Sequence, residues 1–130
     1  MAKPVTNSEN RFFEIASILS GEDKNIITGN MMSSPGIKYK NKVIAFYHRN
    51  EMIFRVGKEA DLVKLGIRKP KFLSPFKSKP PMTGWICLGY GERSNWGKIC
   101  RFALAVMKLE IDKSNRFILR FTFIISTNLL

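Results

Sequence analysis

The chain has 130 residues, of which 45% are hydrophobic, and it carries a formal net charge of +12. This length and apolar content suit one domain with a buried core. Its two cysteines lack the spacing of a metal site or a disulfide framework, and no apolar signal segment opens the sequence, so we expect a reduced, cytoplasmic protein.

The positive charge is concentrated in the middle of the chain. Residues 36–91 carry twelve basic and three acidic side chains, which is +9 of the net +12, and no acidic residue occurs between Asp61 and Glu92. Such a balance favours an anionic partner. A charge excess that only maintains solubility is the alternative.

The first predicted element is a helix near the N-terminus, after a lead-in at residues 1–6. Thr6 and Glu9 have the spacing of a capping box. The apolar residues between Phe12 and Leu19 fall on one stripe at helical spacing, and Gly21 is a stop signal.

Residues 25–56 change to short apolar runs separated by turn residues, which predicts an antiparallel meander covered by helices on one side. Ile26 and Ile27 lead to a turn at 34–36, and three strands are expected at 37–40, 43–47 and 52–56, with turns at 41–42 and 49–50 between them. A two-residue turn would be strained at Lys42, so we expect a longer one there.

The second half of the chain is predicted to contain helices, an irregular segment and a strand. Residues 58–65 indicate a short helix ended by Gly66, and the proline-rich, basic residues 67–81 indicate an irregular crossing segment. A strand is expected at 84–90. Ser94 is a candidate N-cap for a helix from Asn95 to about Glu110. Its buried stripe is predicted from the i, i+3, i+4, i+7 spacing: Trp96, Ile99, Cys100, Ala103, Leu104 and Met107.

The tail, residues 114–130, is unusually apolar for a terminus. Because Arg116 and Arg120 interrupt it, the tail is too short and too charged to span a membrane. Its β-branched and aromatic residues favour a strand, either as an added edge strand or as an aggregation-prone extension.

Three segments together resemble a known family. These are GNMMSSPGIKYKNKVIAFYHRNEMIFRV (29–56), KPPMTGWICL (79–88) and NWGKICRFALAVMK (95–108). In order and spacing they resemble the N-terminal domain of the TfoX/Sxy regulators of bacterial natural competence. The resemblance covers about three fifths of the chain, and its motifs are structural in character.

The resemblance implies an α+β fold of two layers, an antiparallel sheet with helices packed on it, in the order α-β-β-β-α-β-β-α over residues 1–113. The full-length regulators are non-enzymatic transcriptional co-activators that work with the cyclic-AMP receptor protein, and they usually carry a second, C-terminal helical domain. This chain ends without that domain. We therefore expect a regulatory or binding module without a cofactor or a membrane partner, whose partner is a protein such as a transcription factor, or nucleic acid bound weakly and non-specifically.

The basic crossing segment contains the candidate nucleic-acid-binding residues. Lysines and arginines on a proline-stiffened loop can contact phosphates, and interleaved phenylalanines can stack on bases. In the alternative, both phenylalanines turn inward and pin the loop to the core. The candidates are Arg68, Lys69, Lys71, Phe72, Phe76, Lys77 and Lys79.

Two further sites are considered. Free backbone amides at the start of the last helix, beside Arg93, Ser94 and Asn95, form a candidate anion site. A second functional hypothesis is a small enzymatic or ligand-binding domain with a pocket near three aromatic residues: Trp85, Tyr90 and Trp96.

Reactive side chains are scarce. His48 is the single histidine and has no cysteine or carboxylate at ligand spacing, so no metal site is expected. Cys87 and Cys100 fall on predicted buried faces, where cysteine usually acts as a small hydrophobic residue. We expect no catalytic residue.

Overall fold

The structure is a computed structural model that describes residues 6–31, 33–67, 69–74, 78 and 80–128, without the side chains of Met31 and residues 115–128. Two helices and six strands make up this part of the chain. They are α1 (Asn7–Glu22), β1 (Ile26–Met31), β2 (Ser34–Tyr39), β3 (Lys42–His48), β4 (Glu51–Arg55), β5 (Lys71–Leu73), β6 (Met82–Gly89) and α2 (Arg93–Asn128), with a 3₁₀ turn, η1 (Tyr90–Glu92), before α2.

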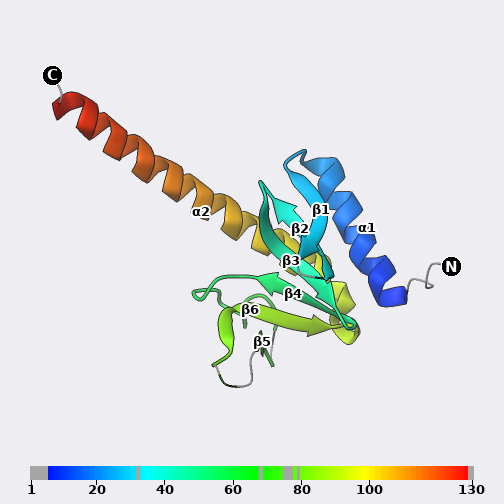
Figure 1. The fold of residues 1–130 in the computed structure, drawn as a ribbon. Helices are drawn as coiled ribbons and strands as arrows, with labels where there is room; N and C mark the ends of the chain where they lie inside the picture. The colour runs from blue at the N-terminus through cyan, green and yellow to red at the C-terminus, as the bar shows by residue number, and fades with distance from the viewer. Residues whose placement is uncertain (1–5, 32, 68, 75–77, 79, 129–130) are drawn as a thin grey trace.

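The strands form one antiparallel sheet in the order β1-β2-β3-β4-β6-β5. Both helices contribute to the main core on one face of this sheet (Figure 1). A smaller apolar cluster on the other face, centred on Phe46, Ile53 and Cys87, contains only strand residues. The expected α+β class, an antiparallel sheet with helices packed on it, is confirmed.

A bulge in β3 explains why its apolar run does not alternate. Lys38 pairs with Val43 and Ile37 pairs with Ala45, so Ile44 is an extra residue on β3. Both Ile44 and Ala45 are fully buried in the main core. A bulge turns two consecutive side chains toward the same face, which here is the face under the helices.

The start of α1 is anchored by its own cap and by a contact with the sheet. The hydroxyl of Thr6 accepts a hydrogen bond from the amide of Glu9 at 3.2 Å, as the capping box predicted. The buried Ser8 donates from its hydroxyl to the Asn50 Oδ1 at 2.6 Å and lies 2.6 Å from the Tyr47 hydroxyl. These bonds tie the helix to the turn between β3 and β4.

Both tight hairpins of the meander use two-residue loops. Lys40 and Asn41 join β2 to β3 with φ of 47° and 67°, and Arg49 and Asn50 join β3 to β4 with φ of 47° and 66°. Positive φ at both loop residues is what a type I′ turn requires. The expected longer turn at 41–42 is therefore wrong, because the strained position is Lys40 and not Lys42.

Residues 34–36 lie in β2 and do not form the expected turn. Gly36 is buried at this point, and a Cβ on it would stand 3.3 Å from the carbonyl oxygen of Ala45. The glycine therefore allows two strands to approach closely. The meander consequently has four strands, where the expected order allowed three.

The expected helix at 58–65 is wrong, because these residues form turns. The segment holds one helix-like bond, from the amide of Leu65 to the carbonyl of Asp61 at 3.2 Å. Gly57 and Gly66 adopt φ of 84° and 85° at its two ends, and Val63 is 80% exposed. A segment this short, without a packed apolar face, does not gain enough to propagate a helix.

The second helix is much longer than expected. α2 begins at Arg93, continues past Glu110 and runs to Asn128, so the expected strand in the tail is wrong. Extending an already packed helix costs little, and no glycine or proline interrupts residues 98–128. In Figure 1 the C-terminal part of α2 projects away from the sheet. Within the described residues, no helix is long and apolar enough to cross a membrane.

Candidate functional site

The described part of the basic crossing segment is held against the sheet. Lys69 is exposed, and Lys71 opens β5, where its ammonium group lies 3.0 Å from both carboxylate oxygens of Glu51. This hydrogen-bonded contact with the Glu51 carboxylate is the main reason why the pKa of Lys71 is raised above its ordinary value. Phe72 is half-buried and packs against the main core. The packing of Phe72 thus agrees with the inward alternative, in which this side chain pins the segment to the core.

The other four candidates of this segment lie outside the described residues: Arg68, Phe76, Lys77 and Lys79. Their predicted role stays a prediction. Within the described residues, the segment offers Lys69 as an exposed cation that takes part in no ion pair.

The start of α2 differs from the expected anion site. The 3₁₀ turn η1 precedes the helix, and the backbone amide of Arg93 donates to the carbonyl of Tyr90. The guanidinium of Arg93 donates to the same carbonyl at 3.2 Å and lies 4.5 Å from the centre of the Tyr90 ring. Ser94 is inside the helix and is not its cap, and Asn95 is half-buried in the same turn. Arg93 is thus engaged by Tyr90.

The three aromatic residues of the expected pocket do not meet in one cavity. Trp96 is fully buried in the main core and donates from its indole nitrogen to the carbonyl of Gly89 at 3.2 Å. Tyr90 lies beside it, with ring centres 6.0 Å apart. Trp85 packs on Phe46 in the cluster on the opposite face of the sheet. Among the hollows described by the structure, Trp85 and Tyr90 thus line different ones, and Trp96 lines neither of these two.

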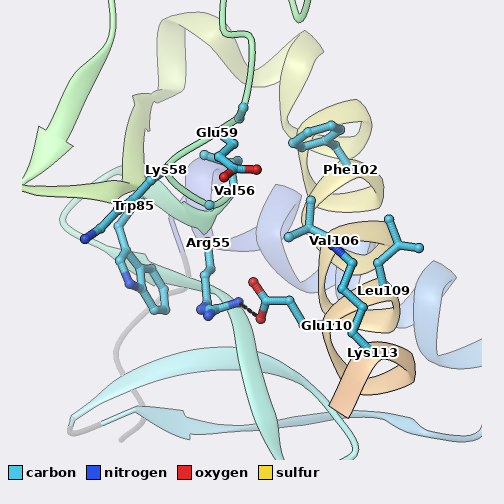
Figure 2. A pocket seen from close by; sticks show the side chains of 13 residues that line it. Arg55, Val56, Lys58, Glu59, Trp85, Phe102, Val106, Leu109, Glu110 and Lys113 are labelled. Carbon is cyan, nitrogen blue, oxygen red and sulfur yellow. Dashed lines mark hydrogen bonds and ion pairs between the residues drawn. The ribbon is translucent and has the colours of Figure 1, made fainter. Parts of the chain in front are cut away.

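Trp85 instead lines an open hollow of about 570 Å³ between the end of β4 and α2 (Figure 2). Its central polar contact is an ion pair from Arg55 to Glu110 at 2.6 Å. These two charges satisfy each other, while Lys58, Glu59 and Lys113 line the same hollow without an ion pair among the described residues. Figure 2 shows Lys58 pointing away from the pair.

His48 has one hydrogen-bonding partner among the described side chains. Its Nδ1 lies 3.2 Å from the hydroxyl of Ser34, at an exposed position. Glu51 is the cross-strand partner of His48, but its carboxylate is bound by Lys71. For Ser34 to act as a nucleophile, His48 would have to be held as its base by an acid, with an oxyanion site nearby. Glu51 does not hold His48 in this way, because its carboxylate is bound by Lys71. No group of His, Cys, Asp and Glu among the described residues could hold a metal ion.

Both cysteines are buried and free, as expected. Burial raises the pKa of Cys87 to about 11 and that of Cys100 to about 12, above the ordinary value of 9.0. Raised pKa values keep both thiols protonated near neutral pH, and a thiol is far less nucleophilic than a thiolate. Reactive cysteines, by contrast, have a lowered pKa and a partly exposed sulfur.

This state of the cysteines can be measured with a thiol reagent. At about pH 8 the folded chain is expected to react at least tenfold more slowly than the chain in denaturant, where both thiols recover their ordinary pKa. Ellman's reagent gives the rates, and Cys87→Ser and Cys100→Ser assign them. A thiol that reacts as fast in the folded chain as in the unfolded chain would contradict the burial described above.

A second concentration of positive charge lies at the β2–β3 hairpin, where sequence reasoning did not place it. We use the name hairpin cluster for five lysines: Lys24, Lys38, Lys40, Lys42 and Lys108. No acidic residue occurs between Asp23 and Glu51, a signal visible in the sequence. Four of the cluster's lysines come from this stretch, and Lys108 joins them from α2.

Two lysines of the hairpin cluster lie over one buried tyrosine. The ammonium groups of Lys40 and Lys108 lie 5.6 Å and 5.5 Å from the centre of the Tyr39 ring. Lys108 also lies 3.4 Å from the Asp23 carboxylate. The pKa of Asp23 is lowered, first by a hydrogen bond from the amide of Asn25 and further by Lys108. Asp23 therefore offsets one of the five charges.

Comparison of the chain with models of protein families, with curated proteins and with solved structures finds no match. The resemblance to the TfoX/Sxy N-terminal domain therefore remains a prediction from the sequence.

Proposed function

We propose that this chain is a non-enzymatic binding module, similar to the N-terminal domain of the TfoX/Sxy regulators, that binds an anionic macromolecule. Charge carries the proposal. Five of the ten acidic side chains are taken up in ion pairs. None of those pairs involves Lys24, Lys38, Lys40 or Lys42, so one end of the sheet keeps an excess of positive charge.

The state of the reactive groups supports a binding role over catalysis. The two thiols are protonated and buried, and the His48 ring is exposed beside Ser34. Enzyme sites usually collect titratable groups with shifted pKa values in a concave pocket. Neither the hollow around Arg55 nor the hollow beside Tyr90 contains His48 or a cysteine.

The partner class can be tested with three polyanions. We expect the full chain to bind heparin, duplex DNA or poly-glutamate saturably at low salt, with an affinity that falls as salt rises because bound counterions are released. Isothermal titration calorimetry measures this. Lack of saturable binding to all three at low ionic strength would overturn the proposal. Binding to one or two of them identifies the kind of anion.

A further inference from the structure

We infer that the hairpin cluster is a docking surface for the phosphate backbone of nucleic acid. This inference rests on the proposed function and assigns both its surface and its partner class. It also moves the contact from the crossing segment at 68–79 to the other end of the sheet.

The hairpin holds its lysines in a defined arrangement. The amide of Lys40 donates to the carbonyl of Asn25 at 3.0 Å, which attaches the turn to the start of β1. Tyr39 is 8% exposed and anchors the same turn in the core. A surface that is ordered before binding loses less conformational entropy when the partner arrives.

Lys38 adds a cation on the face of the sheet away from the helices. Its side chain lies across Gly29 on β1, where a Cβ on the glycine would stand 3.1 Å from the Lys38 Cε. Gly29 is paired with Gly36 across the two strands. Gly36 is buried, so the Lys38 side chain lies against the strand surface over Gly29 and stays partly exposed there.

The composition of the hairpin favours phosphates over a protein partner. The turn residues Lys40 and Asn41 and the following Lys42 are all exposed and polar. Protein interfaces are stabilised mainly by buried aromatic and aliphatic anchors at their centre, whereas phosphate contacts require cations and hydrogen-bond donors. Lysines on a turn, together with an asparagine amide, meet the second requirement.

The opposing charges near the cluster do not cancel it. Glu110 lines the hollow under the hairpin together with Lys42, but it is paired with Arg55 at 2.6 Å. Among the side chains that the structure describes, Asp23 is the one carboxylate in ion-pair contact with the cluster, through Lys108. The hairpin therefore keeps a net positive potential.

The test compares two triple variants of the full chain that lose the same charge. Lys38→Ser, Lys40→Ser and Lys42→Ser remove the hairpin cations. Lys58→Ser, Lys64→Ser and Lys98→Ser, the loop variant, remove three exposed lysines at the loop after β4, where the Lys98 ammonium group donates to the carbonyl of Leu65. Fluorescence anisotropy with a mixed-sequence duplex DNA of about 20 base pairs, at about 0.05 M and 0.15 M NaCl, gives affinities and salt slopes.

The hairpin variant is expected to lose about tenfold or more in affinity at low salt, with a salt slope smaller by about 2–3, since each phosphate contact contributes about 0.9 to the slope. The loop variant is expected to lose less than about threefold. Lys→Arg at the three hairpin positions is expected to keep binding, and equal melting temperatures show that all variants fold.

Equal losses in the two variants, or no loss in the hairpin variant, would overturn the assignment of the surface while binding by the wild type leaves the proposed function standing. Wild-type binding to poly-glutamate without binding to duplex DNA would overturn the assignment of nucleic acid. Failure of the wild type to bind any polyanion would overturn the proposed function as well.

Discussion

Replacing Phe12 by alanine is expected to lower the free energy of unfolding by about 3–5 kcal/mol, the usual cost of removing a buried phenylalanine. Phe12 is 0% exposed and lies in the main core, with its ring centre 6.0 Å from that of Tyr47 on β3. It therefore joins α1 to the sheet. Urea denaturation followed by circular dichroism measures the change.

The neighbouring residue supplies a matched control. Phe13 is 41% exposed and touches Phe12 edge to face, with ring centres 5.2 Å apart. Phe13→Ala should cost no more than about 1.5 kcal/mol, the value of such an aromatic contact. If Phe12→Ala does not fold, Phe12→Leu still tests the site through its smaller loss. Equal losses for Phe12→Ala and Phe13→Ala would mean that α1 packs by another face.

Leu104→Ala is expected to destabilise the protein by about 2–5 kcal/mol, because the cavity it leaves lies between α2 and the sheet. Leu104 is 8% exposed and belongs to the main core. Leu109, one and a half turns further along the same helix, is 60% exposed. Leu109→Ala should therefore change stability by less than about 1 kcal/mol.

These two variants change the same atoms on the same helix, so their difference reports burial alone. Chemical denaturation, analysed with the same dependence of the free energy of unfolding on denaturant concentration for both variants, gives the comparison. A larger loss for Leu109→Ala than for Leu104→Ala would show that the opposite side of α2 faces the sheet.

Local patterns in the chain predicted those elements whose signals lie within a few residues. The Thr6 cap and the stripe that includes Phe12 predicted α1, and the apolar spacing from Trp96 to Met107 predicted the packed part of α2. The stripe residues of α2 are all buried in the structure. The helical spacing of apolar residues predicts which face of a helix is buried, and this prediction does not require knowing which element packs against that face.

The sequence predicted the wrong secondary structure where a segment's conformation depends on contacts with other parts of the chain. Residues 58–65 have helix-forming composition, yet Val63 finds no apolar surface to cover it. Gly36 resembles a turn residue in sequence, but the close carbonyl of Ala45 makes it a strand residue. The apolar tail suits a strand by composition, although α2 simply continues through it.

The candidate site was predicted only in part. A net charge of +12 is enough to suggest an anionic partner. The sequence placed the candidate binding residues in the longest run without an acidic residue, 62–91. In the structure, Lys71 of this run is paired with Glu51. Pairing between β4 and β6, and between β6 and β5, determines that contact.

By itself the sequence determined the amount of charge, α1, the packed part of α2 with its buried face, and the strands β3 and β4, because each depends on the spacing of residues along the chain. Only the tertiary structure decided which charges remain unpaired. Asn25, Lys40 and Lys108 are far apart in sequence and meet around Tyr39 because β1 pairs with β2 and α2 packs over the sheet. Electrostatic potential depends on distances in space, and the fold sets those distances.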